Sequence, residues 1–113
     1  MENVPETRPA MLTAFVCSPF GGKRKNQKLA ARICELVGSW GIAPYAPHLI
    51  YPWFLKDEDA SRTMAIRWGM EYLIRCDVLF YWAEEITAGM QQELNYANKL
   101  GMNILPIYRK DLL

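Results

Sequence analysis

A polar stretch after the first apolar run of the chain carries residue types that bind anions. Residues 18–25, SPFGGKRK, combine the hydroxyl of Ser18, the glycines Gly21 and Gly22, and a run of cations that begins at Lys23. Backbone N–H groups exposed by glycines, together with positive charge before a helix, form a cradle for an anion. The stretch has neither the Walker pattern nor the GxGxxG fingerprint, so an ordinary glycine-rich turn is an equal alternative. We take Ser18, Gly21, Gly22 and Lys23 as candidate phosphate- or sugar-binding residues.

A second polar stretch, which follows the apolar run VLFYW, carries the candidate nucleophile. Thr87 and Gly89 stand at the start of a predicted helix, and Glu93 lies on its first full turn, facing back toward the end of the preceding strand. Ligands of open α/β sheets bind at that edge. Each residue also has a purely structural explanation, because threonine is a common N-cap and most glutamates on helices are solvated.

The elements that must position these residues alternate along the chain. Strands are predicted at residues 11–17, 42–46, 78–82 and 103–108, and helices at 26–40, 61–75 and from about 88 to Gly101. This alternation predicts an α/β fold, a flavodoxin- or Rossmann-like three-layer sandwich with a parallel sheet in the order 2-1-3-4 and helices on both faces. Both polar stretches then meet at a crevice between the first and third strands. Pro106 indicates that the last strand lies at an edge.

Composition narrows the class of protein. The chain has 113 residues, 51% of them hydrophobic, and a net charge of +1. We expect one domain at residues 11–113 after a lead-in at 1–10, with no nucleic-acid partner and no membrane partner. Three widely spaced cysteines and a single histidine, His48, give no metal spacing, so we expect free thiols, a cytoplasmic location, and neither a metal nor a cofactor.

Two segments in the middle of the chain suggest contacts beyond the crevice. Residues 48–59 are aromatic and acidic without a clear period, which favours a lid or wall. Phe20, His48 and Trp53 are candidate contacts to a base, although aromatic side chains also fill cores. The helix at 61–75 is apolar around much of its circumference, which predicts a homodimer or higher homo-oligomer.

From residue 16 to residue 107 the chain resembles the nucleoside 2-deoxyribosyltransferase superfamily, near the 2'-deoxynucleoside 5'-monophosphate N-glycosidases. The matching features are CSPFGGKRKN, CDVLFYWAEE, GMQQELNYA and GMNILPIY. The resemblance implies that Glu93 is the nucleophile, because family members place it three intervening residues after a glycine, here Gly89. It also implies that Thr87 replaces a phosphate-binding serine and that Ser18, Gly21 and Gly22 hold the phosphate or sugar.

The same resemblance exposes two departures from the family pattern. Active members carry an aspartate on the helix before the third strand, where this chain has Gly69. They also often continue into a further strand or tail, whereas this chain ends at Leu113. Small members of the superfamily with no assigned activity resemble the segment 44–69 more closely, including Arg62. That second resemblance implies that Asp57, Asp59 or Arg62 replaces the missing acid or fixes the lid.

Three functions follow as alternatives. The first is an enzyme, an N-glycosidase or deoxyribosyltransferase that uses Glu93 to attack the anomeric carbon of a nucleotide, with the small-molecule substrate anchored by its phosphate. The second is a module that binds a nucleotide without cleaving it, as Gly69 suggests. The third is an oligomeric interaction protein whose crevice has no function.

Overall fold

Four parallel strands form one sheet in the order β2-β1-β3-β4, which confirms the predicted order. They are β1 (Thr13–Cys17), β2 (Ala43–Tyr45), β3 (Val78–Trp82) and β4 (Asn103–Ile107). In the register of the sheet, Phe15 lies between Tyr45 of β2 and Leu79 of β3. These positions come from a computed structural model that describes residues 11–20, 23–56 and 58–113.

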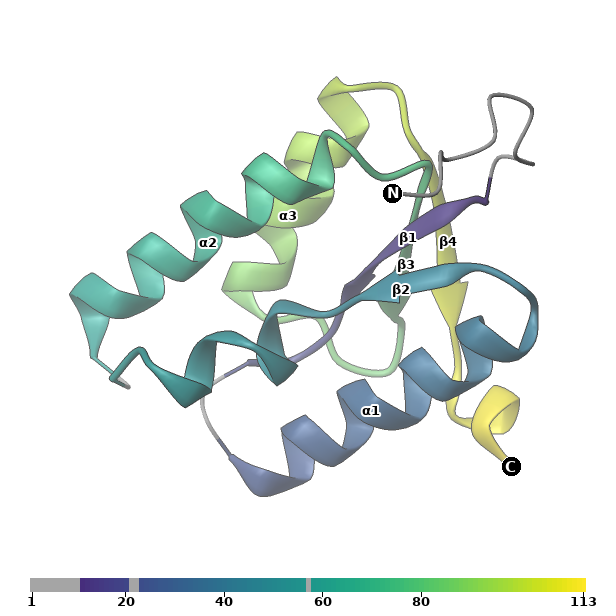
Figure 1. Cartoon of the computed structure of the whole chain (residues 1–113), viewed down its shortest axis with the longest axis horizontal. Helices are drawn as coiled ribbons and strands as arrows, with labels where there is room; N and C mark the ends of the chain where they lie inside the picture. The colour runs from purple at the N-terminus through teal and green to yellow at the C-terminus, as the bar shows by residue number, and fades with distance from the viewer. Residues whose placement is uncertain (1–10, 21–22, 57) are drawn as a thin grey trace, which may run out of the picture.

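Helices cover both faces of the sheet, as predicted (Figure 1). The first helix, α1 (Arg24–Ser39), packs on one face, and α2 (Asp59–Leu73) and α3 (Ala88–Lys99) lie together on the other. The reason lies in the strand order: the chain moves outward from β1 to β2, then crosses back to β3 and on to β4. Right-handed crossovers made in opposite directions place their helices on opposite faces.

The strands read as continuous apolar runs because both of their faces are covered. Residues 14–17 of β1 are fully buried, and Leu79 and Phe80 of β3 are buried beside them. A strand of a parallel sheet that is covered by helices needs no polar face, so it shows no alternation. Two glycines end α1 and α3 with positive φ angles, +81° at Gly41 and +71° at Gly101, a backbone conformation that other residues rarely adopt.

The segment after β2 forms a wall rather than a loose lid. It contains two 3-10 turns, η1 (Pro47–Leu49) and η2 (Tyr51–Trp53). The Tyr51 ring is buried 5.6 Å from the ring of Trp68 on α2, and the Phe54 ring stacks on the same tryptophan at 6.1 Å. Aromatic packing onto α2 therefore fixes this segment beside the crevice.

Two helix faces differ from the sequence-based expectation. The first helix was predicted to reach residue 40, but α1 ends at Ser39; the Trp40 side chain is 50% exposed, with its ring 5.5 Å from that of Phe80. The buried residues of α2 are spaced four positions apart and lie on one face of the helix: Ala65, Gly69 and Leu73. Among the described residues, no helix is long and apolar enough to cross a membrane.

Candidate active-site pocket

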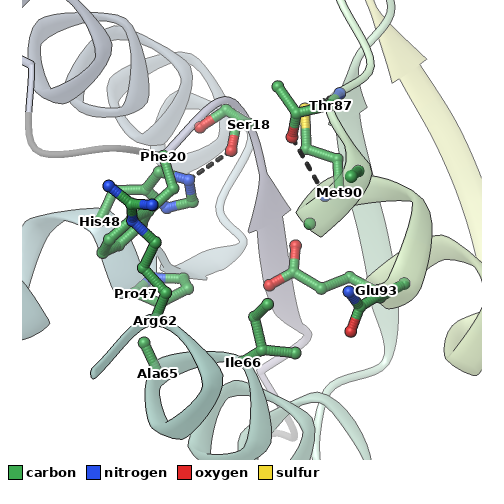
Figure 2. A pocket seen from close by; sticks show the side chains of 13 residues that line it. Ser18, Phe20, Pro47, His48, Arg62, Ala65, Ile66, Thr87, Met90 and Glu93 are labelled. Atoms are coloured by element: carbon green, nitrogen blue, oxygen red, sulfur yellow. Dashed lines mark hydrogen bonds between the residues drawn. The ribbon is translucent and has the colours of Figure 1, made fainter. Parts of the chain in front are cut away.

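A cavity of about 320 Å³ opens where the chain leaves β1 and where it enters α3 (Figure 2). Its walls come from both of these segments, from η1 and from α2. Seven of the residues selected from the sequence line it: Ser18, Phe20, His48, Arg62, Thr87, Gly89 and Glu93. The topology therefore brings together side chains that are up to 75 positions apart in the sequence, Ser18 and Glu93 being the extremes.

Glu93 presents a buried carboxylate to this cavity. Its side chain points from α3 toward β1 and α2 (Figure 2), and the residue is only 6% exposed. Burial raises the pKa of Glu93 to about 7, because the charged form loses its hydration, and the adjacent Cys17 thiol opposes that shift. A carboxyl group of this kind changes charge near neutral pH, which is typical of groups that take part in catalysis.

The start of α3 forms the part of the wall next to Glu93. Thr87 is the N-cap, as the sequence predicts, and its Oγ1 accepts a hydrogen bond of 3.2 Å from the N–H of Met90. The backbone N–H groups of Ala88 and Gly89 have no acceptor within the helix, and both residues line the cavity. Such groups, at the positive end of the helix dipole, favour an anionic ligand.

Ser18 and His48 join the end of β1 to η1. The Nε2–H of His48 donates to the Ser18 carbonyl oxygen, which fixes the imidazole as the tautomer with a free Nδ1. Burial lowers the pKa of His48 to about 4, and the bond to Ser18 offsets part of that shift. His48 is therefore neutral at pH 7. Both Nδ1 of His48 and Oγ of Ser18 are buried without a hydrogen-bond partner among the described residues.

Phe20 is the candidate contact to a base, and Arg62 is the candidate contact to a phosphate. The Phe20 ring meets the His48 ring edge to face, with centroids 4.8 Å apart. The Phe20 carbonyl accepts a bond of 2.8 Å from Asn26, which ties the loop after β1 to α1. From the facing helix α2, Arg62 reaches toward both rings (Figure 2) and also pairs with Asp59 at 3.3 Å.

Gly69 occupies the place on α2 that lies over the Glu93 carboxylate. An added Cβ atom there would lie 3.7 Å from Oε2 of Glu93 and 3.6 Å from Cζ of Phe15. The resemblance had aligned this glycine with a family aspartate. A side chain at this position would contact the carboxylate, whichever residue relatives carry there.

Five residues selected from the sequence do not contribute to the described walls. Lys23 is exposed and does not line the cavity. Trp53, selected as a base contact, is 87% exposed and borders a separate surface hollow beside Leu49, because η2 turns its ring outward. Gly21, Gly22 and Asp57 lie outside the described residues.

Apart from Arg62, the residues of α2 that line the cavity were not predicted from the sequence. The apolar face of this helix was assigned to assembly, but Ala65 and Ile66 line the cavity together with Arg62. The signal was the helical spacing of residues 62, 65, 66 and 69, which places them on one face. Four further wall residues had no signal of their own in the sequence: Pro47, Ala88, Met90 and Gln92.

Metal ligands and cysteine thiolates are the other groups considered for chemistry among the described residues. The described part of the chain has no cluster of side chains suited to a metal ion. All three cysteines are free. Burial raises the pKa of Cys17 well above its usual value and that of Cys34 to about 11, so neither is a thiolate at neutral pH.

Comparison with known proteins supports the fold. The family model described as a domain of unknown function, DUF7768, matches residues 12–107. Among solved structures, the chain is similar to a 2-deoxyribosyltransferase from the psychrotolerant bacterium Bacillus psychrosaccharolyticus, with a TM-score of 0.69 and 16% sequence identity. The match covers 85% of this chain and 72% of that one. A comparison with curated proteins found no match. At this identity the structural likeness establishes a shared fold, the α/β fold of a deoxyribosyltransferase.

Proposed function

We propose that this chain, which belongs to the DUF7768 family, binds a nucleotide and uses Glu93 to cleave or transfer its N-glycosidic bond. The observation that carries the proposal is the position of Glu93. Its carboxylate is buried in a cavity at the carboxyl end of β1, beside the anion-binding start of α3. The 2-deoxyribosyltransferase of similar fold is a biocatalyst for the synthesis of nucleosides, which supports a nucleoside-like ligand here.

The chemistry follows from the two kinds of group in the cavity. The N–H groups of Ala88 and Gly89, with the hydroxyl of Thr87, hold the phosphate, and Arg62 supplies a positive charge from the opposite wall. An anchored phosphate directs the sugar toward Glu93, which attacks the anomeric carbon. Water or a second base then resolves the glycosyl-enzyme, giving hydrolysis or transfer.

One assay tests this proposal against a binding module. The protein is incubated with a panel of nucleoside and deoxynucleoside 5'-monophosphates, and free base is measured by chromatography for the wild type, Glu93→Gln and Glu35→Gln. Glu35 is an exposed glutamate of α1 on the far face of the sheet, so its variant should match the wild type. Release that Glu93→Gln abolishes supports the proposal. Release that survives Glu93→Gln contradicts the assignment of the nucleophile.

A nucleotide-binding module is the second candidate, and Gly69 is the observation that favours it. Among the described wall residues Glu93 is the only acid, and uncharged bases need a proton in order to leave. A module of this kind would show a higher melting temperature with excess nucleotide but release no base from any member of the panel.

Assembly and location remain parts of the proposal. Met64 and Tyr72 of α2 and Ile74 at its end are between 43% and 52% exposed, so this part of the chain presents large apolar side chains to solvent. We propose that a second copy covers it. Sedimentation of the wild type beside Met64→Glu tests this, and a wild type that is monomeric at all concentrations contradicts it. The three free thiols suit a reducing compartment such as the cytoplasm.

A further inference from the structure

The cavity has a nucleophile but no partner acid along its described walls. Gly69 occupies the position from which a side chain would contact Glu93, because a Cβ atom added there would lie 3.7 Å from Oε2. Two further acids of the described residues, Asp59 and Glu84, have other partners. The side chain of Asp59 is fully exposed and bonded to Arg62, and Glu84 accepts a hydrogen bond of 2.9 Å from the N–H of Arg109.

Neither His48 of the described walls nor Tyr51, which lies near Glu93 without lining the cavity, can give a proton at neutral pH. His48 is neutral, and its one ring proton is committed to the Ser18 carbonyl. The hydroxyl groups of Tyr51 and Tyr45 form a hydrogen bond of 2.8 Å with each other. Burial raises the pKa of both phenols. Glu93 cannot act as acid in the step in which it attacks as a carboxylate.

The lack of a proton donor along the described walls limits the bases that the site can release. An uncharged base leaves an N-glycoside as an anion unless an acid protonates it, and that proton is worth about 10²- to 10⁴-fold in rate. A base that is already cationic, such as an N-glycosylated pyridinium or an N7-alkylated purine, leaves as a neutral molecule. It needs no acid, because the electrons of the broken bond cancel its charge.

We propose that the substrate of this site is a mononucleotide whose base is cationic at the glycosidic nitrogen. This inference rests on the proposed function of Glu93. An oxygen of Glu93 bonds to the anomeric carbon while the bond from that carbon to the base nitrogen breaks, and the electron pair of that bond neutralises the base. Water then attacks the anomeric carbon, Glu93 leaves as a carboxylate, and one proton passes to solvent. Each turnover consumes one water and releases one proton.

The charges and size of the cavity suit this class of ligand. Glu93 places a negative group on one wall, and Arg62 with the start of α3 places positive charge on the others, as a zwitterionic nucleotide requires. The Phe20 ring can face a cationic base, since the faces of aromatic rings attract cations. A bound cation also lowers the pKa of Glu93 from about 7, which favours the attacking carboxylate. A volume of about 320 Å³ is near the lower end for ligand sites, which favours a mononucleotide over a dinucleotide.

Two pairs of probes that differ mainly in charge test the proposal. Nicotinamide mononucleotide is compared with its reduced dihydropyridine form, and 7-methylguanosine 5'-monophosphate with guanosine 5'-monophosphate. Free base is measured by chromatography and the released proton in a weakly buffered solution. We expect the cationic member of at least one pair to react at least about a hundredfold faster than its uncharged partner, with one proton per base and no reaction in Glu93→Gln. The pair that reacts identifies the base as a pyridinium or an alkylated purine.

The other outcomes separate this inference from the proposed function. Release of charged and uncharged bases at similar rates overturns the inference, since some group then supplies the proton, while Glu93 keeps its role. No release from any nucleotide overturns both. A second variant, Gly69→Asp, restores an acid beside Glu93 and should raise the rate with guanosine 5'-monophosphate more than the rate with the methylated form. Gly69→Ala, which adds a side chain without an acid, should not.

Discussion

Gly69 of α2 lies directly over Glu93 of α3, so close that a Cβ atom on the glycine would contact Oε2 of the carboxylate at 3.7 Å. The same Cβ would touch the ring of Phe15 at 3.6 Å, which places the glycine at the junction of two helices and the central strand. A side chain at position 69 would therefore lie against the buried carboxylate that lines the cavity.

Gly69→Ala should stabilise the protein. Contacts of 3.6 to 3.9 Å are ordinary van der Waals distances, so the methyl group fits without displacing its neighbours. Alanine in a helix interior is favoured over glycine by roughly 0.5–1 kcal/mol. Unfolding by urea measures the difference. Gly38→Ala in α1 is the control, because nothing lies within 4 Å of its Cβ position and only helix propensity acts there. Destabilisation by Gly69→Ala alone would show that the contact with Glu93 tolerates no added atoms.

The sequence predicts the fold well because the signals for it are local. Continuous apolar runs mark the strands, and Gly41 and Gly101 mark helix ends, each within a few residues of the element concerned. The contact between Gly69 and Glu93 is different in kind. It depends on how α2 packs against α3, and only a resemblance to relatives pointed to the glycine.

The same distinction explains the residues that were misplaced. Trp53 was selected because an aromatic side chain near a crevice can stack on a base, but the turn of η2 directs it outward. Ala65 and Ile66 were overlooked because small and aliphatic side chains carry no chemical signal. Side-chain direction in a 3-10 segment follows from tertiary packing, here that of Tyr51 on Trp68.

Two buried groups should give opposite dependences of stability on pH. The pKa of Glu93 rises from 4.5 when unfolded to about 7 when folded, so the folded state binds the extra proton between those values and loses stability as pH rises. The pKa of His48 falls from 6.5 to about 4, so the unfolded state binds the extra proton and stability rises with pH over that window. Between about pH 4.5 and 6.5 the two contributions cancel in the wild type.

Single variants should separate the two contributions. Glu93→Gln leaves only His48, so its free energy of unfolding should fall by up to about 3 kcal/mol as the pH drops from 6.5 to 4. His48→Gln leaves only Glu93, so its stability should fall by a similar amount as the pH rises from 4.5 to 7. Urea unfolding at pH steps of half a unit measures both, with the wild type as reference. Parallel profiles for the two variants would contradict the assignment of either shift.

Thr87→Ala should destabilise the start of α3. The variant loses the hydroxyl that accepts from the N–H of Met90 at 3.2 Å, and losing a threonine cap costs about 1 kcal/mol. Thr87→Ser retains the acceptor and should keep most of the stability. Thr87→Ala also removes the hydroxyl proposed to hold the phosphate, so phosphate binding should weaken in this variant and not in Thr87→Ser. Equal stability of the alanine and serine variants would show that the cap contributes nothing.

Arg62→Gln should weaken the binding of phosphorylated ligands. The arginine lines the cavity, and its pair with the fully exposed Asp59 side chain is screened by solvent and adds little to stability. A bond from a charged group to a phosphate is worth roughly 1.5–3 kcal/mol, which corresponds to a loss of affinity of about 10- to 100-fold. Calorimetric titration with guanosine 5'-monophosphate measures that loss, and guanosine shows whether it depends on the phosphate. Arg67→Gln is the matched control, since Arg67 is exposed on the same helix and does not line the cavity. An equal loss for guanosine and its monophosphate would assign Arg62 to the shape of the wall instead of to recognition of the phosphate.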